Sequence, residues 1–333
     1  AAAVAGMKYL AAQGVTAVHH MGTWRDVEVF RLAQRRGLLT TRVYALTPLA
    51  EWQRLADEVA ARGRGDDWLQ LGGLKGFVDG SLGSHTAAFL HGYADDPASR
   101  GLLVNTAEDL EAWTEGADRA GLQVAVHAIG DRAIRLQLDV YERVARRNGP
   151  RDRRFRIEHA QHIAPADVVR FGKLGVIASM QPYHAIDDGR WADAVIGAER
   201  SATTYAFRSL LESGGRLAFG SDWFVAPATP LEGIDAAATR RTLDGKHPGG
   251  WVPAQKIAAE DALRAYTSGA AYAAFAENSR GTLEEGKLAD LVVLDRDILR
   301  GDILRPRETE IGQAQVMLTM VGGKIVYERE PAR

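Results

Sequence analysis

The 333-residue chain contains no cysteine, and this absence excludes several kinds of chemistry. Disulfide bonds, thiolate nucleophiles and cysteine-ligated zinc are all ruled out. Any metal site must therefore use histidine, carboxylate or modified lysine side chains as ligands.

The sequence also lacks an excess of charge of either sign and a long hydrophobic run. It has 41 Lys and Arg residues against 43 Asp and Glu residues, a balance that does not favour nucleic acid as a partner. No apolar stretch approaches the roughly 18 to 20 residues that cross a bilayer, and the alanine-rich start lacks the regions of a signal peptide. We therefore expect a cytoplasmic protein that binds neither nucleic acid nor membrane and acts on a small-molecule substrate.

Strand-like runs alternate with amphipathic segments along most of the chain. Segments such as 24–36 and 132–147 have apolar residues near the i, i+3, i+4 spacing of a helix. A repeated order of strand and helix predicts a parallel sheet. The strand-like runs are residues 15–20, 41–46, 71–78, 122–127, 155–158, 176–180 and 216–220.

This repeat predicts an α/β fold, a TIM-type (β/α)8 barrel from which the first strand is missing. A closed barrel of this kind needs eight strands, yet segment 2–13 has the pattern of a helix. We favour the interpretation that the chain begins after the first strand. The alternative is that segment 79–105 hides a strand.

The pattern changes near residue 281. From there the sequence has short strand-like runs and glycine turns, without amphipathic helices between them. We therefore predict a barrel domain over residues 1–280 and part of a small β-sandwich domain over residues 281–333.

Three strand-like runs lead into a side chain that can bind a metal ion, namely His127, His159 and Asp222. In a barrel of parallel strands, functional groups lie at the carboxyl ends of the strands, where the following loops form the open mouth. Two imidazoles and a carboxylate suit Zn²⁺, and Asp131 or Glu158 could orient them. Each histidine alone could be a hydrogen-bonded structural residue, but the coincidence at three strand ends favours a metal site.

Lys75 lies within an apolar strand-like run, where an unpaired cation is costly to bury. Burial lowers the pKa of a lysine and makes its amine available for covalent chemistry. The amine could react with carbon dioxide to give a carbamate that bridges two metal ions, or form a Schiff base with a carbonyl substrate. A structural alternative is that Lys75 reaches the barrel end or pairs with Asp79.

Six short motifs follow one another along essentially the whole chain: Lys75-Gly-Phe-Val-Asp-Gly-Ser-Leu-Gly-Ser84, His127-Ala-Ile-Gly-Asp131-Arg-Ala, Arg156-Ile-Glu-His159-Ala-Gln, Ser179-Met-Gln-Pro182, Phe219-Gly-Ser-Asp222-Trp and Gly286-Lys-Leu-Ala-Asp-Leu-Val-Val-Leu294. Together they resemble the amidohydrolase superfamily, in its YtcJ-like branch (amidohydrolase family 3). The combination is more specific than any single motif.

The resemblance implies a metal-dependent hydrolase that cleaves an amide or another non-peptide C–N bond with metal-activated water. It implies that carboxylated Lys75, His127, His159 and Asp222 bind one or two divalent ions, which we expect to be zinc. Asp222 would also act as the general base, taking a proton from water and passing it to the leaving group.

The resemblance further implies substrate contacts around this centre. Gln181 and His184 are expected to touch the substrate rather than the metal ion. Apart from the resemblance, the position of Trp223 at a strand end, beside the predicted base, leads us to expect that it lines the substrate pocket, although packing between loops is an equal alternative.

The sequence departs from the family because it has no His-x-His pair, which members carry at the end of the first strand. His19 and His20 are adjacent, so in a strand their side chains point to opposite faces and cannot simply replace that pair. We interpret His20 as an ordinary polar residue, with a metal ligand or a substrate contact as alternatives. The missing first strand and the missing His-x-His pair have one explanation, that the chain lacks the N-terminal region of the family.

Two other hypotheses remain open. The chain could be an inactive fragment or a binding scaffold of this fold, because it lacks the His-x-His ligands. Less favoured is a Schiff-base lyase that uses Lys75. An open barrel would also expose strand edges, which a partner segment or a homo-oligomer could cover.

Overall fold

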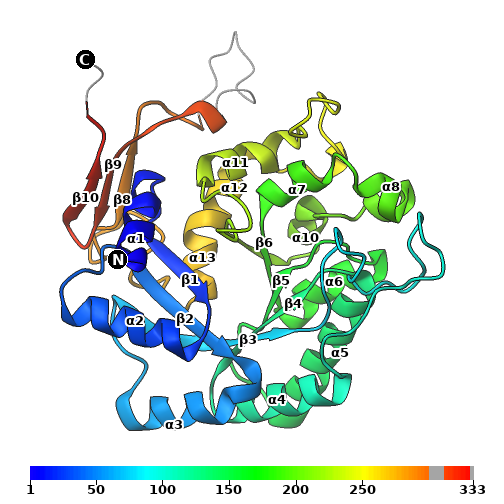
Figure 1. Ribbon diagram of the computed structural model, residues 1–333, viewed down its shortest axis with the longest axis horizontal. Helices are drawn as coiled ribbons and strands as arrows, with labels where there is room; N and C mark the ends of the chain where they lie inside the picture. The colour runs from blue at the N-terminus through cyan, green and yellow to red at the C-terminus, as the bar shows by residue number, and fades with distance from the viewer. Residues whose placement is uncertain (300–310, 331–333) are drawn as a thin grey trace.

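A parallel sheet of seven strands dominates the computed structural model, which describes residues 1–299 and 311–330 (Figure 1). The strands pair in the order of the sequence, and every pair is parallel. Their bounds are β1 Ala17–Met21, β2 Arg42–Pro48, β3 Leu69–Phe77, β4 Gln123–Ala128, β5 Arg156–His159, β6 Ile177–Met180 and β7 Arg216–Phe219.

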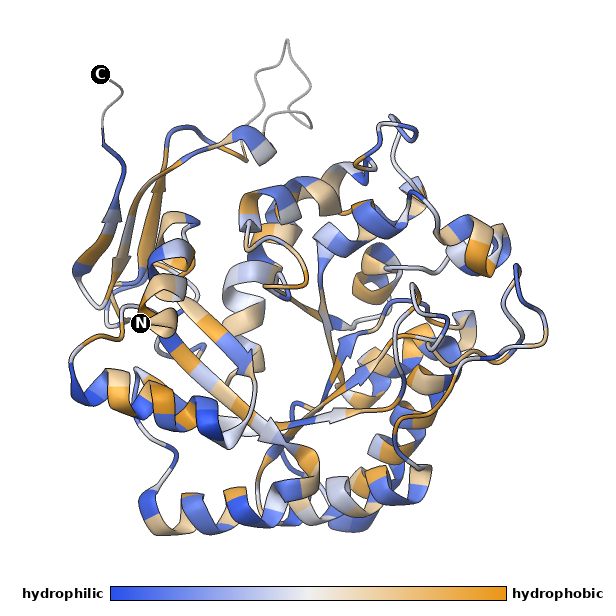
Figure 2. Cartoon of the chain, viewed as in Figure 1, coloured by the Kyte–Doolittle hydropathy of each residue, from blue (hydrophilic) through white to orange (hydrophobic). Residues whose placement is uncertain are grey.

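Helices connect the strands and cover the outside of the curled sheet (Figure 1). Apolar and polar residues alternate along them, as Figure 2 shows, which is the pattern of helices that bury one face. None of the helices among the described residues is long and apolar enough to cross a membrane. The α-helices are α1 Ala2–Ala12, α2 Trp24–Arg35, α3 Trp52–Arg62, α4 Ala107–Arg119, α5 Asp131–Asn148, α6 Pro165–Leu174, α7 Pro182–Asp188, α8 Ala192–Ile196, α9 Ala198–Ser201, α10 Phe207–Glu212, α11 Pro230–Thr239, α12 Ala259–Arg264 and α13 Ala270–Ala273.

The predicted barrel is present only in part. Each of the seven predicted runs overlaps one strand, and segment 2–13 contains helix α1, as expected. However, no eighth strand joins β7 to β1 within the described residues, so the sheet curls without closing. Segment 79–105 forms a loop with one isolated bridge, so the alternative that it hides a barrel strand is wrong.

A small antiparallel sheet follows the parallel one in the chain. Its strands are β8 Leu291–Leu294, β9 Val316–Val321 and β10 Lys324–Glu328, paired in the order β10-β9-β8. This agrees with the predicted β unit after residue 281, whereas the domain boundary at residue 280 stays a prediction. Helix α1 packs on the small sheet, and Thr319 donates a 2.7 Å hydrogen bond to the carbonyl of Ala11.

A buried ion pair joins the two sheets. Arg42, on β2, donates to both carboxylate oxygens of Asp290 at 2.6 and 2.8 Å, and the side chains are 2% and 5% exposed. The backbone N–H of Gly322 donates to the same carboxylate at 2.8 Å. Asp290 therefore ties the turn between β9 and β10 to the parallel sheet.

Candidate metal centre

The four predicted metal ligands lie toward the carboxyl end of the parallel sheet. Lys75 is on β3, His127 on β4, His159 is the last residue of β5, and Asp222 follows β7. All four line one cavity of about 1960 Å³. Residues that are far apart in the sequence thus meet at one edge of the sheet, as the parallel arrangement requires.

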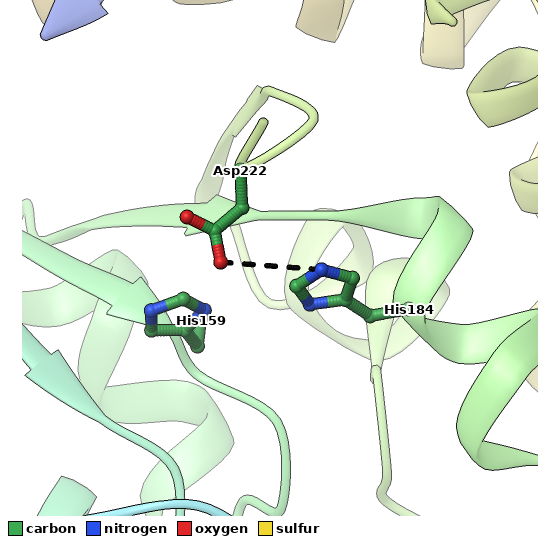
Figure 3. Close-up of side chains that lie close together, drawn as sticks. All are labelled: His159, His184 and Asp222. Carbon is green, nitrogen blue, oxygen red and sulfur yellow. Dashed lines mark ion pairs between the residues drawn. The ribbon is translucent and has the colours of Figure 1, made fainter. Parts of the chain in front are cut away.

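The tightest cluster consists of His159, His184 and Asp222, which point toward one another in Figure 3. One ligand atom from each residue lies within 4.8 Å of the others. The Nε2 of His184 is 4.0 Å from the Oδ2 of Asp222 and has no hydrogen-bond partner among the described residues, although it is buried. Buried polar atoms are rarely left without a partner, so this donor set fits a divalent metal ion.

The ring of His159 is held by Gln181. The Nδ1 of His159 lies 2.9 Å from the Oε1 of Gln181. Because an amide oxygen only accepts, we assign the hydrogen of His159 to Nδ1, which leaves Nε2 as a lone-pair donor. His159 has a φ of +73° and Asp222 a φ of +57°, conformations that are costly for residues with a side chain and that cluster at functional sites.

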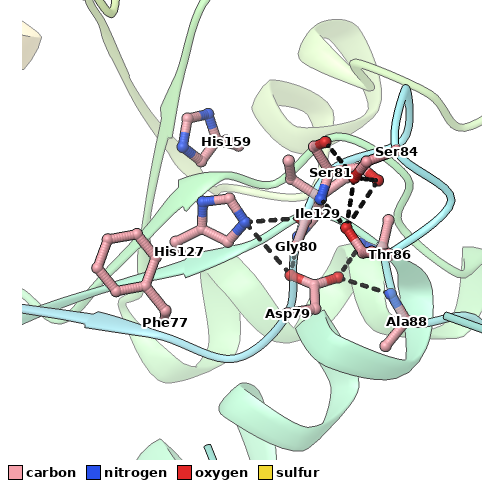
Figure 4. A network of polar contacts seen from close by, with 12 residues as sticks. Phe77, Asp79, Gly80, Ser81, Ser84, Thr86, Ala88, His127, Ile129 and His159 are labelled. Carbon is pink, nitrogen blue, oxygen red and sulfur yellow. Dashed lines mark hydrogen bonds and ion pairs between the residues drawn. The ribbon is translucent and has the colours of Figure 1, made fainter. Parts of the chain in front are cut away.

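The ring of His127 is held by the backbone. Its Nε2 lies 2.9 Å from the carbonyl oxygen of Gly80 and 3.5 Å from the Oδ1 of Asp79, as Figure 4 shows. Since both atoms accept hydrogen bonds, the Nε2 of His127 donates and its Nδ1 is the free ligand atom. The rings of His127 and His159 are 4.6 Å apart between centroids.

The hydrogen-bond partners of Asp79 are backbone groups rather than Lys75. Its buried carboxylate accepts hydrogen bonds from the backbone N–H groups of Ala88, Ile129 and Gly130 at 2.8 to 3.0 Å. Figure 4 shows the contact with Ala88. Burial raises the pKa of Asp79 to about 7, against the effect of these hydrogen bonds. The sequence analysis offered an ion pair between Lys75 and Asp79 as an alternative, and it did not foresee these hydrogen bonds from the backbone.

The two residues proposed to orient the ligands have other partners. Glu158 forms an ion pair with Arg156 at 2.8 Å, and both side chains are buried. Asp131 accepts a 2.7 Å hydrogen bond from the backbone N–H of Leu90. Both carboxylates thus have partners outside the set of candidate ligands.

Lys75 is buried among aromatic and acidic groups. Its Nζ lies 4.8 Å from the ring centroid of Phe77. Burial lowers the pKa of Lys75 to about 8, and the nearby charges of Glu158 and Asp222 act in the opposite direction. A substantial fraction of this amine is therefore neutral, and nucleophilic, at mildly alkaline pH.

The other candidate ligands have the protonation states that metal binding needs. Burial lowers the pKa of His127 and of His184 to about 4, and it lowers the pKa of His159 well below its ordinary value. Burial raises the pKa of Asp222 to about 6, and Lys75 opposes this shift. At neutral pH the three imidazoles are neutral and the carboxylate is ionised.

The residues predicted to contact substrate occupy three different settings. Gln181 occupies the N-cap position of α7, and its side chain holds His159, a role that the sequence interpretation missed. His184, on α7, points at Asp222. Trp223 lies on the cavity wall, 45% exposed, with its ring 5.3 Å from that of Tyr9.

His19 and His20 point to opposite sides of β1, as predicted. The Nδ1 of His19 lies 3.0 Å from a guanidinium nitrogen of Arg156, which is on β5. The Nε2 of His20 lies 3.7 Å from the carboxylate of Asp26, next to α2. The two rings thus have separate partners.

Comparison with known proteins gives a consistent result. The amidohydrolase family model matches residues 1–327. Protein LONG AFTER FAR-RED 3 of Arabidopsis thaliana is 42% identical over 96% of the chain. YtcJ of Bacillus subtilis is 31% identical over 79% of it, and the N-substituted formamide deformylase of Arthrobacter pascens is 32% identical over 64%.

The fold is also similar to the folds of solved structures. A metal-dependent hydrolase of uncharacterized function from Pyrococcus horikoshii has a TM-score of 0.76 and 32% identity, with 85% of this chain and 56% of that one covered. The chain spans 56%, 48% and 38% of the lengths of the three curated relatives, in the order given above.

Proposed function

The chain belongs to the amidohydrolase family, and on that premise we propose that it is a metal-dependent hydrolase that cleaves an amide or another non-peptide C–N bond of a small molecule. The observation that carries the proposal is the cluster of His159, His184 and Asp222 around an unpartnered buried nitrogen. The relative named N-substituted formamide deformylase supports formamides as the first substrates to test.

Lys75, His127, His159 and Asp222 would hold one or two divalent ions, and we propose zinc because imidazole and carboxylate are ligands that zinc accepts. Such an ion lowers the pKa of water toward about 7 and polarises a carbonyl oxygen. A carbamate on Lys75 would add an anionic oxygen ligand to the two histidines. The buried, partly neutral amine supports this modification.

The part of Asp222 in the reaction is to move a proton. Its carboxylate takes a proton from the attacking water as the water oxygen bonds to the carbonyl carbon. The same group then gives the proton to the nitrogen as the C–N bond breaks. A pKa of about 6 suits both steps at neutral pH. The carboxylate is ionised and can take the proton from water, and its pKa is close enough to 7 for it to hold that proton until the nitrogen accepts it.

A second candidate is a lyase in which Lys75 forms a Schiff base with a carbonyl substrate. The lowered pKa of its amine favours this chemistry. Borohydride in the presence of substrate would link substrate to Lys75 in a lyase. A carbamate on that lysine would not be reduced onto the substrate.

The test of the proposed function is a metal-dependent assay of the chain. The protein is stripped with a chelator, reloaded with Zn²⁺, Mn²⁺ or Co²⁺, and assayed for amine release from N-substituted formamides and other amides. We expect turnover only in the reloaded samples. Turnover that survives chelation would contradict the proposal, and metal binding without turnover on any amide would favour the binding scaffold.

A further inference from the structure

We propose that the 223–225 run, which consists of Trp223, Phe224 and Val225, selects the substrate by binding an uncharged aromatic substituent of the amide. This role rests on the proposed function and deepens it, because it names the class of amide. Neutral aromatic amides should be substrates, whereas amides whose substituent carries a carboxylate should not.

The 223–225 run exposes three consecutive large apolar side chains. Trp223 is 45% exposed, Phe224 88% and Val225 74%. Single exposed apolar side chains are common, but a run of three is unfavourable in water unless it has a function. All three residues line the cavity that contains the candidate metal centre. The function that we infer is therefore binding within this cavity.

The run lies beside the group that we expect to move the proton. Asp222 directly precedes Trp223, and the backbone N–H of Val225 donates a 2.8 Å hydrogen bond to the carbonyl of Asp222. A substituent in contact with this run therefore belongs to a molecule whose reacting bond lies near Asp222. The run is placed to contact the part of the substrate next to the bond that breaks.

Helix α1 supports the run from behind. The ring of Trp223 lies 5.3 Å from that of Tyr9, between centroids. It also lies against Gly6, where a side chain would come within 3.4 Å of the ring. Trp223 is thus held by packing, and a surface that is already in place loses less conformational entropy when a ligand binds.

A further aromatic ring lies on the other side of the candidate centre. Phe77, at the end of β3, is 44% exposed and lines the same cavity. Its ring is 5.4 Å from that of His127, between centroids, and the two lie next to each other in Figure 4. Pockets for small molecules are lined mainly by apolar and aromatic side chains around a few polar groups, and this cavity has that composition near Asp222.

Two of the basic side chains on the cavity wall already have acidic partners. Arg156 is paired with the buried Glu158 at 2.8 Å. Arg296, after β8, is paired with Asp295 at 2.9 Å. The basic residues that the structure describes on the cavity wall are Lys75, Arg156, Arg280 and Arg296.

The other two basic side chains are also poorly placed to receive a carboxylate. Arg280 is close enough to Arg42, the first residue of β2, for their charges to interact, so it lies toward the amino end of the sheet. The amine of Lys75 interacts with the charge of Asp222. It belongs to the proposed metal centre, where a carbamate would make it anionic.

Carboxylates prevail at the carboxyl end of the cavity. A carboxylate on the substrate would lose its water next to like charges, which is unfavourable, whereas an uncharged ring has no such cost. This charge pattern favours a neutral occupant for the 223–225 run. The acidic residues that line this end, all in segments that follow a strand, are Asp26, Asp187, Asp188 and Asp222.

The test compares three formamides with the zinc-loaded chain: N-phenethylformamide, its para-carboxy derivative and N-methylformamide. The para-carboxylate points away from the amide, so its effect reports on the substituent site. We expect kcat/KM for N-phenethylformamide to exceed the values for the other two by at least about 10-fold, the effect of burying one aromatic ring. Equal values for the neutral and the carboxylated compound would overturn the inference and leave the hydrolase intact.

A variant then assigns the preference to the run. Phe224→Ala should raise KM for N-phenethylformamide by about 10-fold and leave KM for N-methylformamide unchanged. Ile325→Ala is the control, because Ile325 is 53% exposed on β10 and does not line the cavity. Circular dichroism and thermal melting show that both variants keep the fold. An unchanged KM in a folded Phe224→Ala would contradict the proposal.

Two further measurements separate the alternatives. Calorimetry of the three compounds reports binding without turnover, so a preference for the neutral ring in a protein that hydrolyses no amide would support the substituent site and contradict the hydrolase. Sedimentation of Phe224→Ala tests whether the run instead joins two copies of the chain. A change in self-association without a change in KM would assign the run to such an interface and overturn the proposal.

Discussion

Gln181 accepts a hydrogen bond from His159 over 2.9 Å, and this contact decides which nitrogen of His159 remains free to bind a metal ion. The neighbouring His127 is oriented by the carbonyl of Gly80 over the same distance. One imidazole is thus set by a side chain and the other by the backbone. Only the first arrangement can be removed by a substitution that leaves the backbone unchanged.

Replacing Gln181 with leucine should weaken metal binding by about 10- to 100-fold, because the ring of His159 loses the acceptor that orients it. Gln181→Glu should retain most of the affinity, since its carboxylate also accepts from Nδ1. The zinc Kd of the three proteins tests this. An unchanged affinity in Gln181→Leu would show that the tautomer of His159 is set elsewhere.

Asp222→Asn should lower kcat by about 10²- to 10⁴-fold, the range that a positioned general base contributes. An asparagine keeps the size of the side chain but cannot take a proton from water. Steady-state kinetics at saturating zinc, with the metal content of each sample, separate loss of the base from loss of the ion. Near-normal kcat in a zinc-loaded variant would exclude Asp222 as the base.

Asp290→Ala should destabilise the protein by about 3 to 5 kcal/mol, because Arg42 remains buried without its carboxylate. The backbone N–H of Gly322 also loses its acceptor. Urea denaturation measures the change in the free energy of unfolding. Glu260→Ala is the control, since its ion pair with Arg264 is exposed and should contribute less than about 1 kcal/mol.

If Asp290→Ala proved as stable as the wild type, the ion pair between the two sheets would not be a significant tie. The double variant Arg42→Leu with Asp290→Ala offers a further check. It should be more stable than Asp290→Ala alone, because no charge is then left buried.

Asp188 should make the free energy of unfolding fall as the pH rises, whereas most carboxylates in folded proteins have the opposite effect. Burial raises its pKa to about 6, from an ordinary value of 3.8. The folded state therefore binds the proton more tightly, and stability from this group falls as the pH rises from about 4 to about 6. The penalty above pH 6 is up to about 3 kcal/mol.

Asp188→Asn removes this titration. We expect its free energy of unfolding, relative to wild type, to rise between pH 4.5 and 6.5 and then to stay level. Asp244→Asn is the control, because hydrogen bonds from Thr242 hold the pKa of Asp244 at about 2, outside that range. A level difference for Asp188→Asn across the whole range would contradict the raised pKa.

The sequence predicted the parallel sheet because each strand is a short apolar run between helical patterns, which is a local property. It could not predict the direction of His184, because α7 begins directly after β6 and its entry angle depends on distant partners such as Tyr205. It also missed the role of Asp79, whose partners are backbone groups of Ala88, Ile129 and Gly130. Backbone donors have no signature in the amino-acid pattern.

The candidate ligands come from different strands of one sheet, β3, β4 and β5, and from the segment after β7. Contacts between residues so distant in sequence form late in folding, because the intervening loops must be closed first. A bound ion would therefore find its complete set of ligands only after the sheet has assembled. Zinc should slow the unfolding reaction and leave the folding rate nearly unchanged, so that the metal protects the finished protein rather than guiding its assembly.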